Sequence, residues 1–429
     1  MSYIVPLLIS FFSLLFLGMP IAFVLGISSV LYFIISGNYS ALYIIAHRSF
    51  AGMNSFVLLA VPLFILAGEI INKGKISEKI LMFANVSVGR CRGGLGYANV
   101  LASMLFGGLT GSALADVAAL GPLEIDMMTK QGYDKEFSTA VTAASALQGP
   151  IIPPSIPAVL IASVTGISVG GLFIGSAIPG VMVGLGAMFV VYILSIRRNY
   201  PVEKKKYTLK EILNIFLLTI PALFTIVIIL GGIIGGIFTP TEAAAVAVVY
   251  VIILSLITRN LNIKNFISAL TSALRTTAKI FIIVGFATVF SWIIAIENIP
   301  EIISNLLLSV SANRYVIILI INLIMLFWGM WMDTAPSIVI LIPLFLPIAK
   351  EIGIHPVHFG VIMIVNLMIG QISPPFGMTL YTAQAVGKVE FSGLIKNIIP
   401  FVIIDIVVLI MITYIPAISL WLPDVFNFL

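Results

Sequence analysis

The chain has 429 residues, of which 60% are hydrophobic and only 9% are charged. Soluble domains carry about 25% charged residues, so this composition excludes a soluble enzyme or binding domain and indicates a chain whose solvent is lipid. The net charge of +5 does not indicate a nucleic-acid partner, because the basic residues lie in short loops between apolar runs. We therefore predict an all-α polytopic membrane protein embedded in a lipid bilayer.

Nine apolar runs are long enough to cross a membrane. The first has no basic start and is too long for the core of a signal peptide, so we expect a retained span, kinked around residues 18–20. In chain order the runs cover residues 4–36, 55–72, 137–165, 172–196, 212–234, 241–258, 280–296, 358–384 and 397–422.

Two further apolar regions, residues 96–127 and 316–349, are interrupted by a polar or glycine-rich tip. The tips read FGGLTGSALADVAAL in the first region and FWGMWMDTAPSIVIL in the second. Two half-length apolar helices joined by a turn are typical of a re-entrant hairpin, which is tolerated only where protein or a watery cavity surrounds the tip. We predict two re-entrant helical hairpins.

The basic residues indicate an orientation. If the loop RRNYPVEKKKYTLK at 197–210 is cytoplasmic, nineteen of the 22 Lys and Arg residues lie on the cytoplasmic side. The first hairpin then enters the membrane from the cytoplasm, and the second enters from outside.

An internal repeat relates the two halves of the chain. A shift of 221 residues aligns 108–154 with 329–375 without a gap, and most identities are glycine or proline. Related halves whose hairpins enter from opposite faces are typical of inverted-repeat secondary transporters. We predict a first repeat over 1–196, a cytoplasmic basic linker over 197–210 and a second repeat over 211–429. The matched pairs are Gly108/Gly329, Pro122/Pro343, Gly132/Gly353, Gly149/Gly370, Pro153/Pro374 and Pro154/Pro375.

Each half contains a proline-broken helix, predicted over 137–165 and over 358–384. Proline has no N–H and clashes with the carbonyl four residues earlier, so each proline pair is expected to free two carbonyls. Bound Na⁺ would satisfy such carbonyls, whereas the alternative is a simple kink whose carbonyls meet water or hydroxyls. The motif occurs twice, so we favour two Na⁺ sites. The freed carbonyls are those of Gly149, Pro150, Gly370 and Gln371.

The hairpin tips offer further oxygen atoms. Thr110 and Ser112 lie at the first turn, and Asp333 and Thr334 lie at the second. These residue types also cap helices, and capping is compatible with ion binding. Asp116 is expected in the first turn of the helix after Ser112, where a carboxylate suits the helix dipole.

Other motifs have structural interpretations. Thr239 and Glu242 flank Pro240 in a predicted capping box. His355 and His358 are expected in a loop without partners at zinc-ligand spacing. TGSALAD lacks the glycine of a nucleophile elbow, and we expected no histidine in an apolar span, so no enzyme is predicted. No nucleotide-binding loop is found that would let ATP drive transport directly.

Five segments spread over the chain resemble the large membrane subunit of tripartite ATP-independent periplasmic (TRAP) transporters. This resemblance implies an elevator-type fold in the bacterial inner membrane and Na⁺-coupled import of an organic acid anion, of the sialic acid or C4-dicarboxylate class. It also implies a small four-helix membrane subunit, expected as a separate chain, and a periplasmic substrate-binding protein. The segments are GGLTGSALADVAALGPLEIDMMTKQGYD, QGPIIPPSIPAVL, GIFTPTEAAAVAVVY, MDTAPSIVILIPLFLPIA and NLMIGQISPPFGMTLYTA.

The resemblance also implies site residues. The first Na⁺ site would use Thr110, Ser112, Gly149, Ile152 and Pro154, largely through backbone oxygens. By the repeat, the second would use Asp333 or Thr334 together with Gly370, Ser373 and Phe376. Substrate is expected between the hairpin tips, near Ser145, Ser155, Asn366 and Thr379. No arginine is placed there, so the positive ends of half-helices are expected to attract the anion.

Three alternatives remain open. One is a carrier on the same fold, coupled to Na⁺ or H⁺, that needs no binding protein. The second is an intramembrane enzyme using Ser112 and Asp333, for which the sequence supplies no good base. The third is an ion channel, which would pass currents far above the turnover of a carrier.

Overall fold

The computed structural model describes residues 3–74, 76–202, 208–259 and 261–429, and all regular structure in these ranges is helical. Within these ranges, eight helical segments are long and apolar enough to cross a membrane, or nine if a bent pair counts as one further span. The α-helices are α1 (Ile4–Phe16), α2 (Ile21–Ile35), α3 (Leu42–Met53), α4 (Ala60–Lys73), α5 (Ile76–Val88), α6 (Gly94–Thr110), α7 (Ala113–Ala119), α8 (Gly121–Lys130), α9 (Lys135–Ala146), α10 (Gln148–Ile151), α11 (Ile156–Thr165), α12 (Val169–Arg197), α13 (Leu209–Ile234), α14 (Pro240–Ile257), α15 (Ile263–Ile296), α16 (Ile299–Val310), α17 (Arg314–Trp331), α18 (Thr334–Glu351), α19 (Pro356–Ile372), α20 (Met378–Gly387), α21 (Phe391–Tyr414) and α22 (Ala417–Val425).

The polytopic all-α prediction is confirmed. The first run breaks between α1 and α2 as predicted, where Gly18 has a φ of +76°. Other boundaries differ from the prediction. The run at 55–72 is preceded by α3, which meets the next helix at a bend of 61°. The run at 397–422 ends early, because the chain leaves α21 at Ile415 and Pro416 before α22 begins. Of the predicted linker over 197–210, residues 203–207 lie outside the described residues.

Both predicted hairpins are present, with arms that differ from the expected half-helices. In the first, α6 turns at Gly111 into the short α7, which continues into α8. In the second, α17 and α18 have 18 residues each, so each is long enough to cross a membrane. The two tips interrupt the helices in different ways. Gly111 has a φ of +62°, in the left-handed region, whereas Met332 has an extended backbone.

Both predicted broken helices are also present. The first runs through α9 and α10, unwinds at residues 152–155 and resumes as α11. The second is α19, which unwinds at residues 373–377 before α20. His358 was expected in a loop, which is wrong: it lies in α19 and is buried, with Nδ1 2.6 Å from the hydroxyl of Ser419. The amphipathic imidazole is accommodated there because a hydroxyl partners it.

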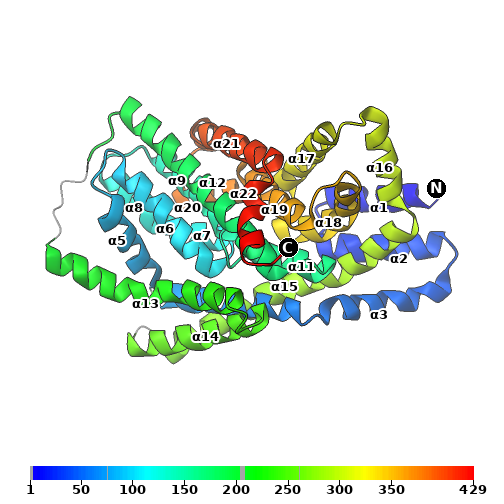
Figure 1. Cartoon of the computed structure of the whole chain (residues 1–429), viewed down its shortest axis with the longest axis horizontal. Coiled ribbons are helices and arrows are strands. Elements are labelled where there is room, and N and C mark those ends of the chain that lie inside the picture. The colour runs from blue at the N-terminus through cyan, green and yellow to red at the C-terminus, as the bar shows by residue number, and fades with distance from the viewer. Residues whose placement is uncertain (1–2, 75, 203–207, 260) are drawn as a thin grey trace.

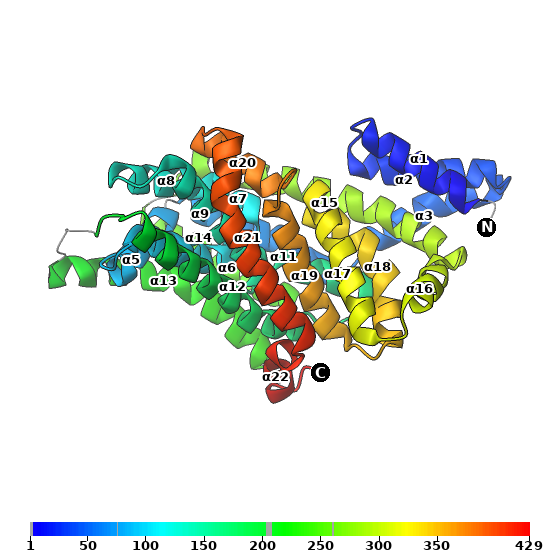
Figure 2. The same ribbon diagram turned by 90° about the horizontal axis from the view of Figure 1, so that it is seen from above.

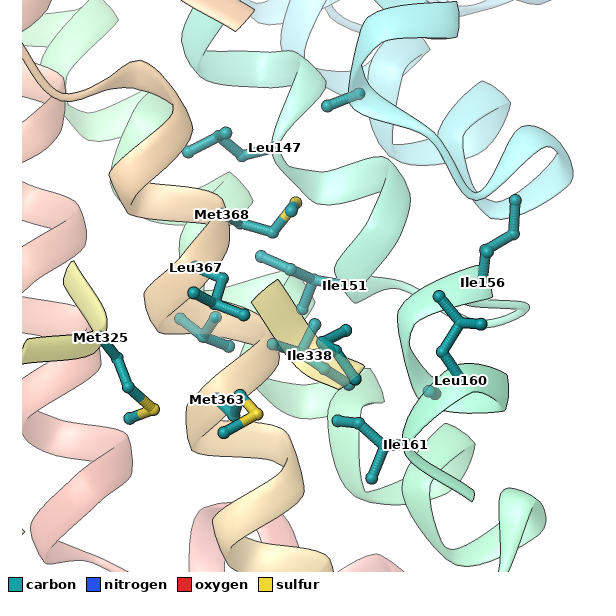
Figure 3. Packing of buried hydrophobic residues seen from close by; sticks show 14 of the residues in the cluster. Leu147, Ile151, Ile156, Leu160, Ile161, Met325, Ile338, Met363, Leu367 and Met368 are labelled. Carbon is teal, nitrogen blue, oxygen red and sulfur yellow. The ribbon is translucent and has the colours of Figure 1, made fainter. Parts of the chain in front are cut away.

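The helices form an elongated assembly in which long helices line one side (Figure 1). Helix α15 packs along α2, α3 and α4, and α14 packs on α4 and α13. The hairpins and broken helices lie beside this layer, as the view from above also shows (Figure 2). The first arms of the two broken helices pack together: Figure 3 shows Leu147 and Ile151 of one beside Leu367 and Met368 of the other. This buried apolar contact places the first unwound segment in the core, whereas the second includes the exposed Pro375 and Phe376.

Candidate ion and substrate cavity

One cavity of about 550 Å³ is lined by both hairpin tips, both broken helices and the two long helices α4 and α15. Its size suits a small organic ligand. Because the tips and the broken helices come from both halves of the chain, this cavity is where the predicted site residues converge. The polar lining residues are Glu69, Asn72, Thr110, Ser112, Thr276, Lys279, Asp333, Thr334 and Gln371.

The first hairpin tip directs oxygen atoms toward the first broken helix. A Cβ added to Gly111 would lie 3.3 Å from the carbonyl oxygen of Pro154, and one added to Gly108 would lie 3.2 Å from that of Pro153. Thr110 is 6% exposed, and its hydroxyl has no hydrogen-bond partner among the described residues. The tip therefore contacts the unwound segment, and it carries a buried hydroxyl without a partner among the described residues. Hydroxyl and carbonyl oxygens of this kind are ligands that suit Na⁺.

Ser112 occupies the predicted cap position. It is extended at the start of α7, and its hydroxyl accepts a hydrogen bond from the backbone N–H of Ala115 at 3.3 Å. Asp116 follows in the first turn of α7, as predicted, and its side chain is buried. Ser112 therefore retains lone-pair capacity toward the cavity that it lines.

A glycine contact holds the first tip on the broken helix. Gly107 and Gly149 touch through their backbones, since a Cβ added to Gly107 would lie 2.2 Å from the Cα of Gly149. The second half has the matching contact between Gly329 and Gly370, at 3.3 Å by the same measure. The repeat alignment pairs Gly108 with Gly329, whereas the residue that makes the matching backbone contact in the first half is Gly107, one residue earlier.

The side-chain amide of Gln371 connects the second hairpin tip to the second broken helix through hydrogen bonds. Gln371 donates from Nε2 to Asp333 at 2.9 Å and to the hydroxyl of Thr334 at 2.6 Å. Its Oε1 accepts from Thr379 at 2.9 Å. Asp333 also caps α18 by accepting from the N–H of Thr334. Gln371 thereby links the tip, α19 and α20 in a single hydrogen-bonded network.

Two of the four carbonyls expected to be free are satisfied within the protein. The Pro150 carbonyl accepts a hydrogen bond from the Ser155 hydroxyl. The Gly370 carbonyl accepts from the N–H of Ser373 at 3.0 Å. The prediction considered only the N–H four residues later in the helix as a donor to each carbonyl. A side-chain hydroxyl satisfies one carbonyl instead, and the N–H of a tighter turn at the helix end satisfies the other.

The other predicted ion ligands lie around the unwound segments without lining the cavity. Ile152 is the C-cap residue of α10, and Pro154 is buried in the first unwound segment. Ser373 is 2% exposed, and its hydroxyl donates to the carbonyl of Ile369 at 2.7 Å. Phe376 is 38% exposed, and its ring lies 3.9 Å from that of Trp331. Their roles as ligands stay predictions.

The four predicted substrate residues are fully buried and none lines the cavity. Ser145 donates to Asn99 at 2.7 Å, and Asn366 donates to Asn322 at 2.9 Å, so both tie neighbouring helices together. Ser155 caps α11, and Thr379 contacts Gln371. The family resemblance implied these residues, but their side chains lie in the packing between helices.

Sequence reasoning missed the wall formed by α4 and α15. Glu69 and Lys279 line the cavity from this wall, and Glu69 accepts a hydrogen bond from Ser272 at 2.6 Å. A usable signal existed, because Glu69 interrupts an apolar run and Lys279 directly precedes one. Ionisable residues at such positions usually face a cavity or a pathway.

The family profile described as "Tripartite ATP-independent periplasmic transporter, DctM component" matches residues 8–418. The chain belongs to this family. Among its relatives, the sialic acid TRAP transporter large permease protein SiaM of Vibrio cholerae is 40% identical over 417 residues, covering 96% of each chain. The C4-dicarboxylate TRAP transporter large permease protein DctM of Pseudomonas aeruginosa is 38% identical over 381 residues, covering 89% of each.

This TRAP permease also has a structural neighbour. The crystal structure of the YdaH transporter of Alcanivorax borkumensis matches it with a TM-score of 0.63 and 14% identity, covering 91% of this chain and 89% of that one. The likeness shows a shared transporter fold. The chain is a multi-pass membrane protein, and its relatives are transport permeases rather than enzymes.

Proposed function

We propose that this TRAP permease imports an organic acid anion together with Na⁺ across the bacterial inner membrane. The observation that carries the proposal is the single cavity on which both hairpin tips and both broken helices converge. Relatives with 40% and 38% identity are named for sialic acid and for C4-dicarboxylates, so these two anion classes are the first candidates.

Two Na⁺ sites are assigned to the two halves. The first uses the Thr110 and Ser112 tip with carbonyls of the unwound segment, including Pro154, and the second uses Asp333 and Thr334 beside α19. Na⁺ favours oxygen ligands of this kind where a helix is broken. Binding of Na⁺ at both tips would fix the cavity walls and add positive charge next to the anion, so ion and substrate would each favour the binding of the other.

The transport step is assigned to an elevator movement of the hairpins and broken helices past the layer that contains α4 and α15. The Gly68 contact supports this assignment: a Cβ on Gly68 of α4 would lie 3.1 Å from the Cα of Thr110. A glycine there lets the tip lie flat on α4, without side-chain interlocking that would oppose sliding.

Family membership implies two partners, a small membrane subunit and a substrate-binding protein. We assign delivery of the anion to a periplasmic binding protein, which would release it into the cavity. The small subunit is assigned to the apolar outer surface, where residues such as Phe16, Leu213 and Leu319 are exposed.

The test is uptake into proteoliposomes that contain the purified permease with its small subunit. Radiolabelled succinate and N-acetylneuraminate are supplied with their binding proteins, under an inward Na⁺ gradient or an equal K⁺ gradient. Uptake of one anion that needs both Na⁺ and the binding protein supports the proposal. Uptake without the binding protein would favour the independent carrier, and uptake that ignores Na⁺ would contradict sodium coupling.

A further inference from the structure

The cavity has one basic side chain among its lining residues, and this residue comes from the wall opposite the hairpin tips. Lys279 lies on α15, on the same helix face as Thr276, Ile280 and Ile283, which also line the cavity. This spacing of three, four and seven residues places the four side chains on one stripe of the helix. The Lys279 side chain is exposed along that stripe.

No residue of the described chain neutralises this lysine. The ion pairs found there are Lys130–Asp126 and Arg198–Asp134, so Lys279 belongs to neither. Glu69 lies across from it on α4, but its carboxylate accepts a hydrogen bond from Ser272, seven residues before Lys279 on α15. The Lys279 ammonium is therefore exposed to the cavity without a carboxylate of the described residues in ion-pair contact, and it is available to an anion that enters the space beside it.

The opposite wall supports an anion at the same place. Helix α18 has 18 residues, and its N-terminal residues Thr334 and Ala335 line the cavity. The N-terminus of such a helix carries partial positive charge. Asp333 beside it is engaged by Gln371 and by the N–H of Thr334, so its charge is partly compensated. An anion between α15 and α18 would therefore meet the Lys279 ammonium on one wall and the N-terminus of α18 on the other, while the carboxylates of Glu69 and Asp333 are engaged in hydrogen bonds.

We infer that Lys279 is the counter-charge for the anionic group of the transported substrate and determines that this permease accepts anions rather than neutral analogues. The inference rests on the proposed function and adds the missing cationic residue to it. Because Lys279 belongs to the layer of α4 and α15, it would hold the anion only while the hairpin tips face that part of α15. The contact thereby marks one end of the transport movement.

A matched control lies on the same helix. Arg275 is also exposed and precedes Lys279 by four residues, but it does not line the cavity. If the basic residues of α15 serve only to orient the chain in the membrane, Lys279→Gln and Arg275→Gln should have the same effect on anion binding. If Lys279 binds the anion, the two substitutions should differ.

The experiment measures binding by thermal stability of the purified permease in saturating Na⁺. The probes are succinate and N-acetylneuraminate, with succinamide and the methyl ester of N-acetylneuraminate as their neutral analogues. The wild-type protein and the Arg275→Gln variant should bind one anion and reject its neutral analogue. Lys279→Gln should weaken binding of the anion about 10-fold or more, leave the neutral analogue unchanged and keep the Na⁺ response. Lys279→Arg should restore most of the affinity.

Equal anion affinity in the wild-type protein and Lys279→Gln would overturn the inference while leaving the proposed function intact. An equal loss in Arg275→Gln would also overturn it, because the effect would then belong to the charge of the helix rather than to the cavity. A wild-type protein that responds to none of the anions would contradict the proposed function itself, and the inference with it. The unchanged Na⁺ response separates loss of anion binding from misfolding.

Discussion

Gly107 and Gly149 touch backbone to backbone, with a Cβ on Gly107 falling 2.2 Å from the Cα of Gly149. The contact joins the first hairpin to the first broken helix immediately beside the unwound segment. It fixes how far the tip oxygens lie from the carbonyls of that segment. The geometry of the first proposed Na⁺ site therefore depends on having glycine, which has no side chain, at both positions.

Gly107→Ala is expected to separate this contact, because backbone atoms cannot rotate away from the added methyl group. Overpacking of this kind costs about 1–3 kcal/mol, and the displaced tip should also weaken the Na⁺ response of uptake. Gly231→Ala is the matched control, since a Cβ there meets nothing within 4 Å and alanine favours the helix. Thermal unfolding and Na⁺-dependent uptake of both variants check the prediction; equal behaviour would contradict it.

The positions of the breaks were predictable from sequence, because proline and glycine act on the backbone locally. The prolines of the two motifs do interrupt their helices, and Ser112, Thr239 and Asp333 cap helices as their residue types indicate. Both helix breaks and both tips therefore followed from residue chemistry. The lengths of the hairpin arms did not, because they depend on how far packing extends each helix.

The composition of the cavity was less predictable, since it depends on which helices meet in space. Ser145 and Asn366 lie about two helical turns before the breaks in sequence, yet they face neighbouring helices. Lys279 lies far from both motifs in sequence, yet it shares their cavity. A helical period defines faces, but it does not say which face meets which neighbour, and that information comes from tertiary packing.

Ser112→Ala should separate capping from ion binding. Loss of a serine cap costs about 1 kcal/mol, and loss of a ligand should additionally lower the apparent affinity for Na⁺. The control is Ser168→Ala, which removes the equivalent cap from α12, where Ser168 accepts from Gly171 at 3.1 Å. We expect similar thermal destabilisation of both variants but a weakened Na⁺ response only in Ser112→Ala. A normal Na⁺ response in Ser112→Ala would remove Ser112 from the first site.

Gln371→Leu should uncouple the second hairpin tip from α19 and α20. The substitution leaves Asp333 and Thr379 without their amide partner, which costs about 1–3 kcal/mol for each unsatisfied buried group. If the second Na⁺ site depends on this network, the Hill coefficient for Na⁺ in uptake should fall from about two toward one. Gln384→Leu in α20 is the control, since its amide makes only a 3.4 Å contact with the Val389 carbonyl. An unchanged Hill coefficient in Gln371→Leu would place the second site elsewhere.

Tyr200, in the segment after α12, contacts the residues at the start of α9. Its hydroxyl donates to Asp134 at 2.5 Å, and its ring stacks on Tyr133 at 4.5 Å. Burial, followed by the hydrogen bond to Asp134, raises the pKa of the Tyr200 hydroxyl to about 12, from an ordinary value of 10.0. Because the pKa is higher in the folded state, the stabilisation is fully present below pH 10 and is lost as the pH rises from 10 toward 12.

Tyr200→Phe keeps the ring and removes the hydroxyl. The variant should therefore melt at a lower temperature than the wild-type protein by a constant difference between pH 7 and pH 9. The difference should shrink above pH 10, where the Tyr200 hydroxyl ionises in the unfolded chain but is still protonated in the folded protein. Thermal unfolding of both proteins across this range makes the comparison, and a difference that grows above pH 10 would contradict the assigned role of the hydroxyl.

Na⁺ binding at the hairpin tips and broken helices is tested most directly by thermal unfolding of the purified permease across a Na⁺ titration. Choline or K⁺ holds the ionic strength constant. A ligand that binds only the folded state stabilises it by about 2.7 kcal/mol at a hundredfold excess over its Kd. We expect a saturable rise in Tm that is specific for Na⁺ and is weakened in Gly107→Ala and Ser112→Ala. A Tm that does not respond to Na⁺, or responds equally to K⁺, would contradict sodium binding at the hairpin tips and broken helices.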